Sequence, residues 1–246
     1  MARRIAIISA MREELRALLA LLEGARTERR AGRDFHVGTI DGRDVMVALS
    51  GIGKVAAAAT TALVFDAFDA RALWLTGVAG GLAEGIAVGD VVIARTLLQH
   101  DMDASPIFPR YEVPLTGRSR FAADAAMADT LAAACGAVLQ APHPALARLG
   151  IERPRLHNGL VISGDRFVAT AAESAALRAA LPDALAVEME GAAVAQVCAD
   201  FERPFAVLRT VSDRADDAAH VDFVRFVDEV AAEYSRDIVR AALAMH

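Results

Sequence analysis

The sequence has little cysteine, no long apolar run and no excess of basic residues. Its two cysteines, Cys135 and Cys198, lie in segments typical of helices, so we interpret them as small buried side chains and not as a disulfide framework. No apolar run approaches the ~18 residues that a membrane-spanning helix needs. Residues 1–9 are too short, and too soon followed by charge, to be a secretory signal. These absences predict a soluble, cytoplasmic protein.

The charge balance argues against nucleic acid as a partner. The 26 Lys and Arg residues stand against 32 Asp and Glu residues, which gives a net charge of −6, whereas phosphate binding needs a basic surface. Apolar residues make up 55% of the chain, enough to offset chain entropy and exclude disorder. The 246 residues contain no linker, repeat or low-complexity tract, so residues 1–246 are expected to form a single domain.

Short apolar runs alternate with amphipathic stretches, a pattern that predicts an α/β fold with a buried sheet. The segment 100–117 is polar, contains proline and shows no period, so we interpret it as a long loop that is functional or interfacial. Strands are predicted at residues 4–9, 35–40, 45–49, 73–76, 91–94, 159–163, 184–187 and 205–211. Helices are predicted at about residues 12–22, 54–68, 121–135, 171–181, 190–201 and 219–245.

The segment Gly51-Ile52-Gly53-Lys54 has three interpretations. It partly fits the dinucleotide-binding fingerprint, but the strand before it belongs to a predicted hairpin and not to a parallel unit. The glycines could instead form a tight turn that lets a helix pack closely, or they could border a small-ligand pocket. The spacing of a Walker phosphate loop is absent.

Nucleophile and metal chemistry have little support. Ser163 lacks the glycine two residues earlier that a nucleophile elbow needs. The segment His100-Asp101-Met102-Asp103 offers one imidazole and two acids in a loop, a combination more typical of plain surface than of a metal site. We therefore predict no metal site.

Acidic residues at the ends of predicted strands are the stronger signal. Glu14 follows the first strand, Glu188 and Glu190 end another, and Asp213 follows the last. If 188–190 is a strand end, the two glutamates point to opposite faces, and at most one enters a given pocket. Helix capping would explain any one of these acids. Three acidic strand ends together favour a two-carboxylate hydrolytic or group-transfer site.

The sequence also contains a series of motifs that resemble the bacterial 5′-methylthioadenosine/S-adenosylhomocysteine nucleosidases of the nucleoside phosphorylase superfamily. Each motif is weak alone, but together and in this order they are specific for the superfamily. They are IAIISAMREE (5–14), SGIGKVAA (50–57), TGVAGGL (76–82), VGDVV (88–92), GLVISGDRF (159–167), VEME (187–190) and RTVSD (209–213).

The resemblance implies a fold and an activity. The fold is a single α/β domain with a central mixed, twisted sheet flanked by helices in a three-layer sandwich. The activity is cleavage by water of the N-glycosidic bond of a 5′-thio-adenosine, with 5′-deoxyadenosine as a further candidate, and it needs no cofactor or metal. By resemblance, Glu14 activates the water, Glu190 holds ribose hydroxyls, and Asp213 hydrogen-bonds or protonates adenine N7.

The resemblance also implies the rest of the pocket. Phe167 would stack on the base, backbone groups of Val168 would read its edge, Met189 would lie beside Glu190, and Ser212 beside Asp213. The further substrate-binding residues it implies are Ala10, Met11, Ile52, Val78, Glu188, Arg209 and Phe223.

The sequence departs from the family pattern at two places. Val78 stands where a serine is expected, which removes a polar contact near the sugar or the water. The segment 100–117 differs from well-known members, and in the family this region lies at a homodimer interface. By resemblance we expect a homodimer, with Phe108 and Pro114 at or close to the interface and able to supply an apolar wall for an alkylthio group.

Three alternatives remain open at this point. A nucleoside phosphorylase would need cationic or amide donors that converge on phosphate. A futalosine-type hydrolase would use the same fold on another purine nucleoside. A non-catalytic nucleoside-binding protein would not need an acid on each side of the scissile bond.

Overall fold

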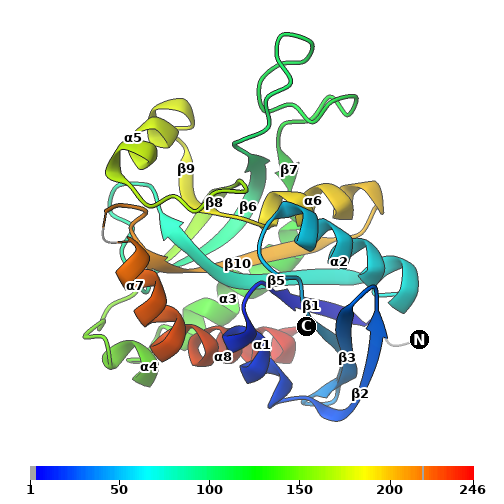
Figure 1. Ribbon diagram of the computed structural model, residues 1–246. Coiled ribbons are helices and arrows are strands. Elements are labelled where there is room, and N and C mark those ends of the chain that lie inside the picture. Colours follow the sequence, from blue (N-terminus) through cyan, green and yellow to red (C-terminus); the bar gives the residue numbers. More distant parts are fainter. Residues whose placement is uncertain (1–3, 218) are drawn as a thin grey trace.

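The strands form one mixed sheet in the computed structural model, which describes residues 4–217 and 219–246. Its order is β10-β6-β8-β9-β5-β1-β4-β3-β2, with β7 paired to β6 (Figure 1). The strands are β1 (Ile5–Ser9), β2 (Glu23–Arg30), β3 (Arg33–Ile40), β4 (Arg43–Leu49), β5 (Ala72–Gly81), β6 (Val91–Gln99), β7 (Phe121–Ala122), β8 (Leu156–Ser163), β9 (Ala184–Glu188) and β10 (Phe205–Asp213).

Strand β5 joins two parts of the sheet. It pairs in parallel with β1 on one side and with β10 on the other, and its last residues, Gly80 and Gly81, pair antiparallel with β9. Because β10 pairs with β6, β6 with β8, and β8 with β9, these strands form a closed ring with β5. On the other side, β4 is parallel to β1, whereas β3 and β2 run antiparallel. The expected mixed sheet is confirmed.

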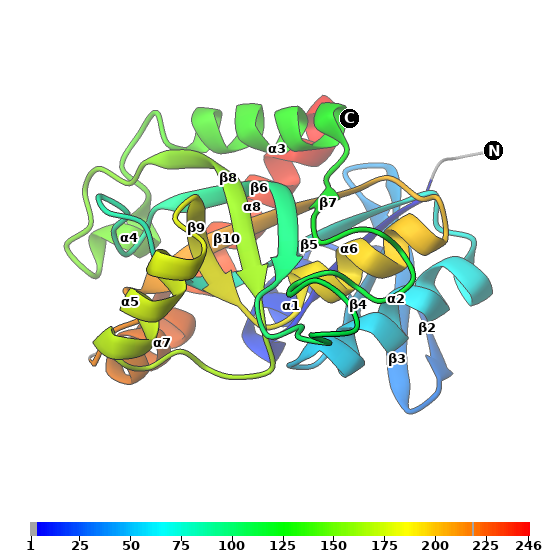
Figure 2. The same ribbon diagram turned by 90° about the horizontal axis from the view of Figure 1, so that it is seen from above.

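Helices cover both faces of the sheet, as the three-layer expectation requires (Figure 2). Helices α2 (Lys54–Phe68) and α6 (Gly191–Asp200) pack on one face, and α1 (Arg12–Leu19), α3 (Ala125–Val138) and α8 (Ala232–Met245) pack on the other. The remaining helices are α4 (Pro144–Ala147), α5 (Ala171–Ala180), α7 (Ala219–Phe226) and the π-helical turn η1 (Val227–Ala231).

The central strands are apolar on both faces because both faces are covered. In β1, Ile5 and Ile7 join the cluster that packs against α8, while Ala6 and Ile8 join the cluster on the α2 side. All four are at most 3% exposed. Burying an isoleucine side chain stabilises a fold by about 1.5–3 kcal/mol, so these continuous apolar runs hold the strands in the middle layer.

Strand β2 was not predicted. Its sequence, EGARTERR, has no apolar alternation, and the strand is exposed along almost its whole length at the edge of the sheet. It pairs with β3 through backbone hydrogen bonds, which leave no trace in the side-chain pattern. The predicted helix 12–22 is correspondingly too long, since α1 ends at Leu19 and the chain then turns into β2.

Two other predicted helices have different bounds. The helix predicted from residue 121 begins at Ala125, because Phe121 and Ala122 pair with β6 and Asp124 caps the helix. The Asp124 Oδ1 accepts the N–H of Met127 at 2.9 Å, as an N-cap does. The helix predicted over 219–245 is interrupted by η1, which separates α7 from α8.

The strands predicted at 73–76 and 91–94 are longer in the structure, where β5 extends to Gly81 and β6 to Gln99, and further expectations agree with it. The segment 100–117 is a loop that stands away from the sheet between β6 and β7 (Figure 1). Cys135 and Cys198 are free and buried, as predicted. Within residues 4–217 and 219–246, none of the helices combines the length and the apolarity that crossing a membrane requires.

Candidate active site

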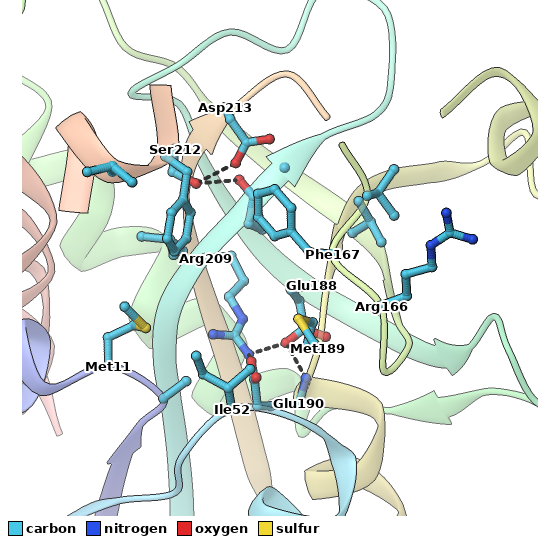
Figure 3. Close-up of a pocket in the computed structure, with 18 residues that line it drawn as sticks. Met11, Ile52, Arg166, Phe167, Glu188, Met189, Glu190, Arg209, Ser212 and Asp213 are labelled. Atoms are coloured by element: carbon cyan, nitrogen blue, oxygen red, sulfur yellow. Dashed lines mark hydrogen bonds and ion pairs between the residues drawn. The ribbon is translucent and has the colours of Figure 1, made fainter. Parts of the chain in front are cut away.

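A cavity of about 410 Å³ opens where the carboxyl ends of β1, β5, β9 and β10 meet the segments that follow β4 and β8 (Figure 3). This is the edge at which α/β sheets bind ligands. The structure brings Asp213 and all the predicted substrate-binding residues to this cavity, while Glu14 lies behind its wall. The cavity is lined by Ala10, Met11, Ile52, Val78, Ala79, Gly80, Arg166, Phe167, Val168, Val187, Glu188, Met189, Glu190, Arg209, Ser212, Asp213, Phe223 and Val224.

Arg209, on β10, is the buried cation of the site. Its side chain is 1% exposed, and its Nη2 contacts Oε2 of Glu188 and lies 3.3 Å from Oε2 of Glu190. A buried guanidinium needs such partners, because removing it from water without them costs several kcal/mol. The arginine therefore gathers both glutamates at one end of the cavity.

Glu188 is fully engaged by donors of the protein. Its Oε1 accepts the Ser163 hydroxyl and the N–H of Gly191 at 3.0 Å. Its Oε2 accepts Arg209 and the N–H groups of Glu190 at 3.0 Å and Gly191 at 2.9 Å. The carboxylate thus occupies the N-terminal end of α6, where the helix dipole favours negative charge. Glu188 is placed to hold Arg209 and α6, although it also borders the cavity.

The expectation that Glu188 and Glu190 point to opposite faces is wrong. Strand β9 ends at Glu188. Glu190 is the N-cap residue of α6, and its backbone angles, φ −131° and ψ −41°, are not those of a strand. The period-two rule of a strand does not extend past its end. Both carboxylates therefore line the same cavity and share Arg209.

Glu190 keeps its carboxylate turned toward the segment after β4. Its Oε1 accepts the N–H of Gly53 at 2.9 Å. Burial and the neighbouring Glu188 raise the pKa of Glu190 to about 7, although Arg209 and the Gly53 N–H act in the opposite direction. Ile52 lines the cavity in front of this contact. The structure agrees with the interpretation that the Gly-x-Gly segment borders a small-ligand pocket. The segment also forms a tight turn, with φ +95° at Gly53.

Glu14 is the most strongly perturbed acid of the site. It lies in the first turn of α1 and is 1% exposed. Within the described part of the chain, neither of its side-chain oxygens meets the geometry of a hydrogen bond. Burial raises its pKa to about 8, and the nearby Arg209 offsets this only in part. A carboxyl in such surroundings holds a proton near neutral pH and is a stronger base than an ordinary glutamate once it has lost that proton.

Asp213 lies at the other end of the cavity, beside Ser212 (Figure 3). The Ser212 hydroxyl lies 2.8 Å from Oδ2 of Asp213 and 3.4 Å from the carbonyl oxygen of Ala79. The Oδ1 of Asp213 accepts the N–H of Ala215 at 2.8 Å. Gly80 leaves room for this side chain, since a Cβ there would lie 2.9 Å from Oδ1. The carboxyl is therefore fixed in orientation as well as buried.

Aromatic and aliphatic side chains form the walls between the two acidic ends. The rings of Phe167 and Phe223 meet edge to face with centroids 5.4 Å apart. Phe167 is 38% exposed, so its remaining face is open to a ligand. Val168 is buried and also lines the cavity, and Met11 and Met189 lie nearer the Arg209 end. Such walls suit a flat, apolar ring with few polar groups.

Several site residues escaped the sequence analysis. The sequence offered Ser163 only as a nucleophile. In the structure its hydroxyl donates a hydrogen bond to Glu188 and accepts one from the N–H of Ala192 at 2.7 Å. Gly53 contributes a backbone N–H, a group that no side-chain pattern reports. Arg166 and Val224 also line the cavity; Arg166 lies within the motif at 159–167 but was assigned no role, and Val224 lies outside the motifs.

The acidic segment after β6 uses its oxygens within the protein. Asp101 accepts hydrogen bonds from Lys54, and Asp103 accepts them from Ser105. Among the described residues, no group of three or more His, Cys, Asp and Glu side chains is arranged to hold a metal ion. Phe108 and Pro114 lie in the loop 100–117 and are not among the described residues that line the cavity.

Comparison with known proteins shows relatives of similar length and fold. The model of the phosphorylase superfamily matches residues 4–244. A 5′-methylthioadenosine/S-adenosylhomocysteine nucleosidase of a Shewanella species is 37% identical over 226 residues, which cover 91% of each chain. The crystal structure of such a nucleosidase from Neisseria meningitidis, in complex with methylthio-immucillin-A, has a TM-score of 0.88 and 35% identity and covers 99% of this chain and all of that one. A futalosine hydrolase mutant of Helicobacter pylori gives a TM-score of 0.84 at 30% identity, with full coverage of both chains.

Proposed function

The chain belongs to the phosphorylase superfamily, and with its site geometry we propose that it hydrolyses the N-glycosidic bond of 5′-methylthioadenosine and S-adenosylhomocysteine. The products are adenine and a 5-substituted ribose. The observation that carries this proposal is the placement of buried acids at both ends of one apolar cavity. Asp213 lies at one end, and Glu190 with Arg209, backed by Glu14, lies at the other. A nucleoside held between them has its base near one acid and its sugar near the others.

At the base end, Asp213 assists the departure of adenine. Adenine is a poor leaving group as an anion, so N7 must receive a strong hydrogen bond or a proton as the C1′–N9 bond breaks. Asp213 is 1% exposed, and Ser212 and the N–H of Ala215 fix its carboxyl. Phe167 stacks on the base, and backbone groups of Val168 read its edge.

At the sugar end, Glu14 takes a proton from the attacking water. The bonding electrons leave with adenine, positive charge develops on the ribosyl ring, and the water oxygen bonds to C1′ as its proton passes to Glu14. A pKa of about 8 leaves roughly one tenth of Glu14 ionised at pH 7, and that fraction is a stronger base than an ordinary glutamate. Glu190, with Met189 beside it, binds the ribose hydroxyls and stabilises the developing charge.

Water, and not phosphate, fits the charges of the cavity. Among the described residues that line it, the cations are Arg166 and Arg209. Arg209 already contacts Glu188 and Glu190, and Arg166 contacts Glu173. A phosphate dianion would have to enter beside buried carboxylates, where like charges repel it. This supports a hydrolase over a phosphorylase.

The proposal includes a homodimer that works in the cytoplasm. Ile107 and Leu115, on the loop that also carries Phe108 and Pro114, are 82% and 90% exposed. Exposed apolar groups on a projecting loop favour contact with a second copy, which would bring Phe108 or Pro114 toward the 5′ end of the neighbouring cavity. The free, buried cysteines are compatible with a reducing compartment. Light scattering coupled to gel filtration tests the dimer.

Measurement of the released purine base tests the activity. Methylthioadenosine, S-adenosylhomocysteine, 5′-deoxyadenosine, adenosine, inosine and futalosine would each be supplied with and without phosphate, beside an Asp213→Asn variant. Release from the thio-nucleosides that is independent of phosphate and largely lost in the variant is the expected result. A requirement for phosphate would reassign the chain to the phosphorylases, and activity on futalosine alone to the futalosine hydrolases. Tight binding without any release would indicate a nucleoside-binding protein.

A further inference from the structure

Lys54 is the only lysine in the chain. The other 25 of the 26 basic residues are arginines. It begins α2 and follows directly on Gly53. A lysine ammonium is a compact point charge with three donors, whereas a guanidinium is a flat fork that needs more room. At this position the ammonium of Lys54 lies between two closely spaced acceptors, Gln99 and Asp101.

The ammonium of Lys54 contacts two acceptors at the end of β6 and just beyond it. Its Nζ donates to Oδ1 of Asp101 at 2.6 Å and to Oε1 of Gln99 at 3.1 Å. The Lys54 side chain is 15% exposed and the Asp101 side chain 34%. Because the pair is partly shielded from solvent, it is stronger than an exposed surface pair.

Asp165, in the segment after β8, closes these contacts into a ring. Its Oδ1 accepts the backbone N–H of Lys54 at 2.7 Å, and its own N–H donates to Oδ2 of Asp101 at 2.9 Å. Burial acts to raise the pKa of Asp101, but the hydrogen bonds from Lys54 and from the Asp165 N–H outweigh it and lower the pKa. We call Lys54, Asp101 and Asp165 the Lys54 ring. It joins the segments that follow β4, β6 and β8.

The Lys54 ring borders two residues of the site without lining the cavity itself. Gly53, next to Lys54, donates its N–H to Oε1 of Glu190 at 2.9 Å. A Cβ at position 53 would lie 3.1 Å from Oδ1 of Asp165, so Gly53 packs directly against the ring. Phe167 follows Asp165 by two residues and lines the cavity. The ring thus ties the segments that carry Gly53 and Phe167 to each other and to the segment after β6.

We propose that Lys54 is a positioning residue, which through the Lys54 ring keeps the Gly53 N–H on Glu190 and holds Phe167 over the base. The inference rests on the proposed function, which assigns Glu190 to the ribose and Phe167 to adenine. Without the ammonium, Asp101 and Gln99 lose their contacts with the Lys54 side chain, and the start of α2 is held to the ring only through the Lys54 backbone N–H on Asp165. Gly53 would then shift, and Glu190 would lose the N–H that orients its carboxylate.

Lys54→Met tests the proposal, because methionine keeps an unbranched apolar side chain and removes the charge. Arg120→Met is the matched control, since it breaks the exposed Arg120–Asp183 ion pair on another part of the surface. Adenine release from methylthioadenosine is measured between about pH 5 and about pH 9. Lys54→Met is expected to lose about 10- to 100-fold in kcat/KM through misplaced binding groups. Arg120→Met is expected to stay within about 2-fold of the wild type.

The pH profile separates positioning from a purely structural role. The acidic limb of kcat/KM contains the ionisations of Glu14 and, at lower pH, of Glu190. The Gly53 N–H acts to lower the pKa of Glu190, so its loss moves the lower of these two ionisations to higher pH in Lys54→Met. A residue that served only stability would lower the thermal midpoint and leave this limb in place. Asp101→Asn is the second variant, because it keeps the shape of the ring and weakens the ion pair. It is expected to shift the limb in the same direction by a smaller amount.

Crystal structures of the two variants give a readout that does not depend on activity. The expected result is a separation of more than about 3.5 Å between the Gly53 nitrogen and Oε1 of Glu190. An unmoved pH limb together with an intact Gly53–Glu190 contact would overturn the proposal. A wild-type protein that releases no adenine would instead reject the proposed function, and the variant structures would still decide the role of Lys54.

Discussion

The guanidinium of Arg209 occupies the space that a side chain at Gly77 would need. A Cβ at position 77 would overlap Nη1 of Arg209, and it would lie 3.3 Å from Cζ and 3.7 Å from Oε1 of Glu14. A free arginine could move aside at little cost, but Nη2 of this one is held by Glu188 and Glu190. Gly77 and Arg209 are paired across β5 and β10. The buried position of the Arg209 guanidinium therefore requires a glycine at position 77.

Gly77→Ala is expected to displace Arg209 from its two glutamates. Breaking a buried ion pair of this kind lowers the free energy of unfolding by about 3 kcal/mol. Urea unfolding measures the loss. Gly136→Ala is the control, because that glycine lies in α3 with nothing within 4 Å of an added Cβ, and alanine there should leave stability unchanged or raise it by up to about 1 kcal/mol. Equal stability of the two variants would contradict the prediction.

Glu14→Gln is expected to make the stability of the protein less dependent on pH. The pKa of Glu14 is raised from 4.5 to about 8 in the fold, so between these values the folded state holds a proton that the unfolded chain releases. This contribution is complete below about pH 4.5 and is lost as the pH rises through about 8. Glutamine does not ionise, so the variant should exceed the wild type in stability at pH 8 by at least about 1 kcal/mol, with a much smaller difference at pH 5.

Urea unfolding at both pH values checks this prediction for Glu14. Glu152→Gln, at an exposed glutamate, should show the same small difference from the wild type at both pH values. A Glu14→Gln effect that does not grow with pH would show that Glu14 ionises normally. The same variant should lose about 10²- to 10⁴-fold in kcat, because glutamine cannot accept the proton of the water.

Ser212→Ala should slow the reaction less than Asp213→Asn does. The serine hydroxyl lies 2.8 Å from Oδ2 of Asp213, so its loss removes one of the contacts that orient the carboxyl and leaves the carboxyl itself in place. A single hydrogen bond to a charged group contributes about 1.5–3 kcal/mol, which corresponds to a loss of roughly 10- to 150-fold in kcat. Steady-state kinetics with methylthioadenosine gives the order of the two variants, and the reverse order would argue against Asp213 as the acid.

Phe167→Leu should weaken substrate binding more than it slows the chemical step. Loss of an aromatic stack costs about 0.5–1.5 kcal/mol, so KM should rise by roughly 2- to 13-fold. Phe201→Leu is a closely matched control, because Phe201 is 39% exposed against 38% for Phe167, and it packs on Phe65 away from the cavity. An equal effect of both substitutions would remove the stacking role.

The sequence predicts those parts of the molecule in which burial dictates residue type. The runs at 5–9 and 205–211 are apolar because helices cover both faces of their strands, and the acids that follow them mark the ligand-binding edge. Phe167 and Arg209 were expected in the pocket because of the resemblance to the nucleosidase family, and not because of their spacing in the sequence. The charged strand β2 escaped prediction because its pairing uses backbone groups alone.

Other features depend on contacts between residues far apart in the chain. Glu190 meets the N–H of Gly53 across 137 positions of sequence, and Arg209 meets Glu188 across 21. Both glutamates enter one cavity because β9 ends between them, and the end of a strand is the part of a pattern that sequence fixes least. The Lys54 ring is similar, since its members come from the start of α2 and from the segments after β6 and β8.

The charges of β2 affect how the protein behaves at high concentration. This strand ends the sheet, so its outer edge could template a strand of another molecule and start aggregation. Arg26, Arg29 and Arg30 have side chains that are 70%, 72% and 55% exposed. A second copy laid against this edge would bring like charges together and would have to strip water from them. The same residues that hide β2 from sequence patterns thus disfavour the addition of a further strand at this edge.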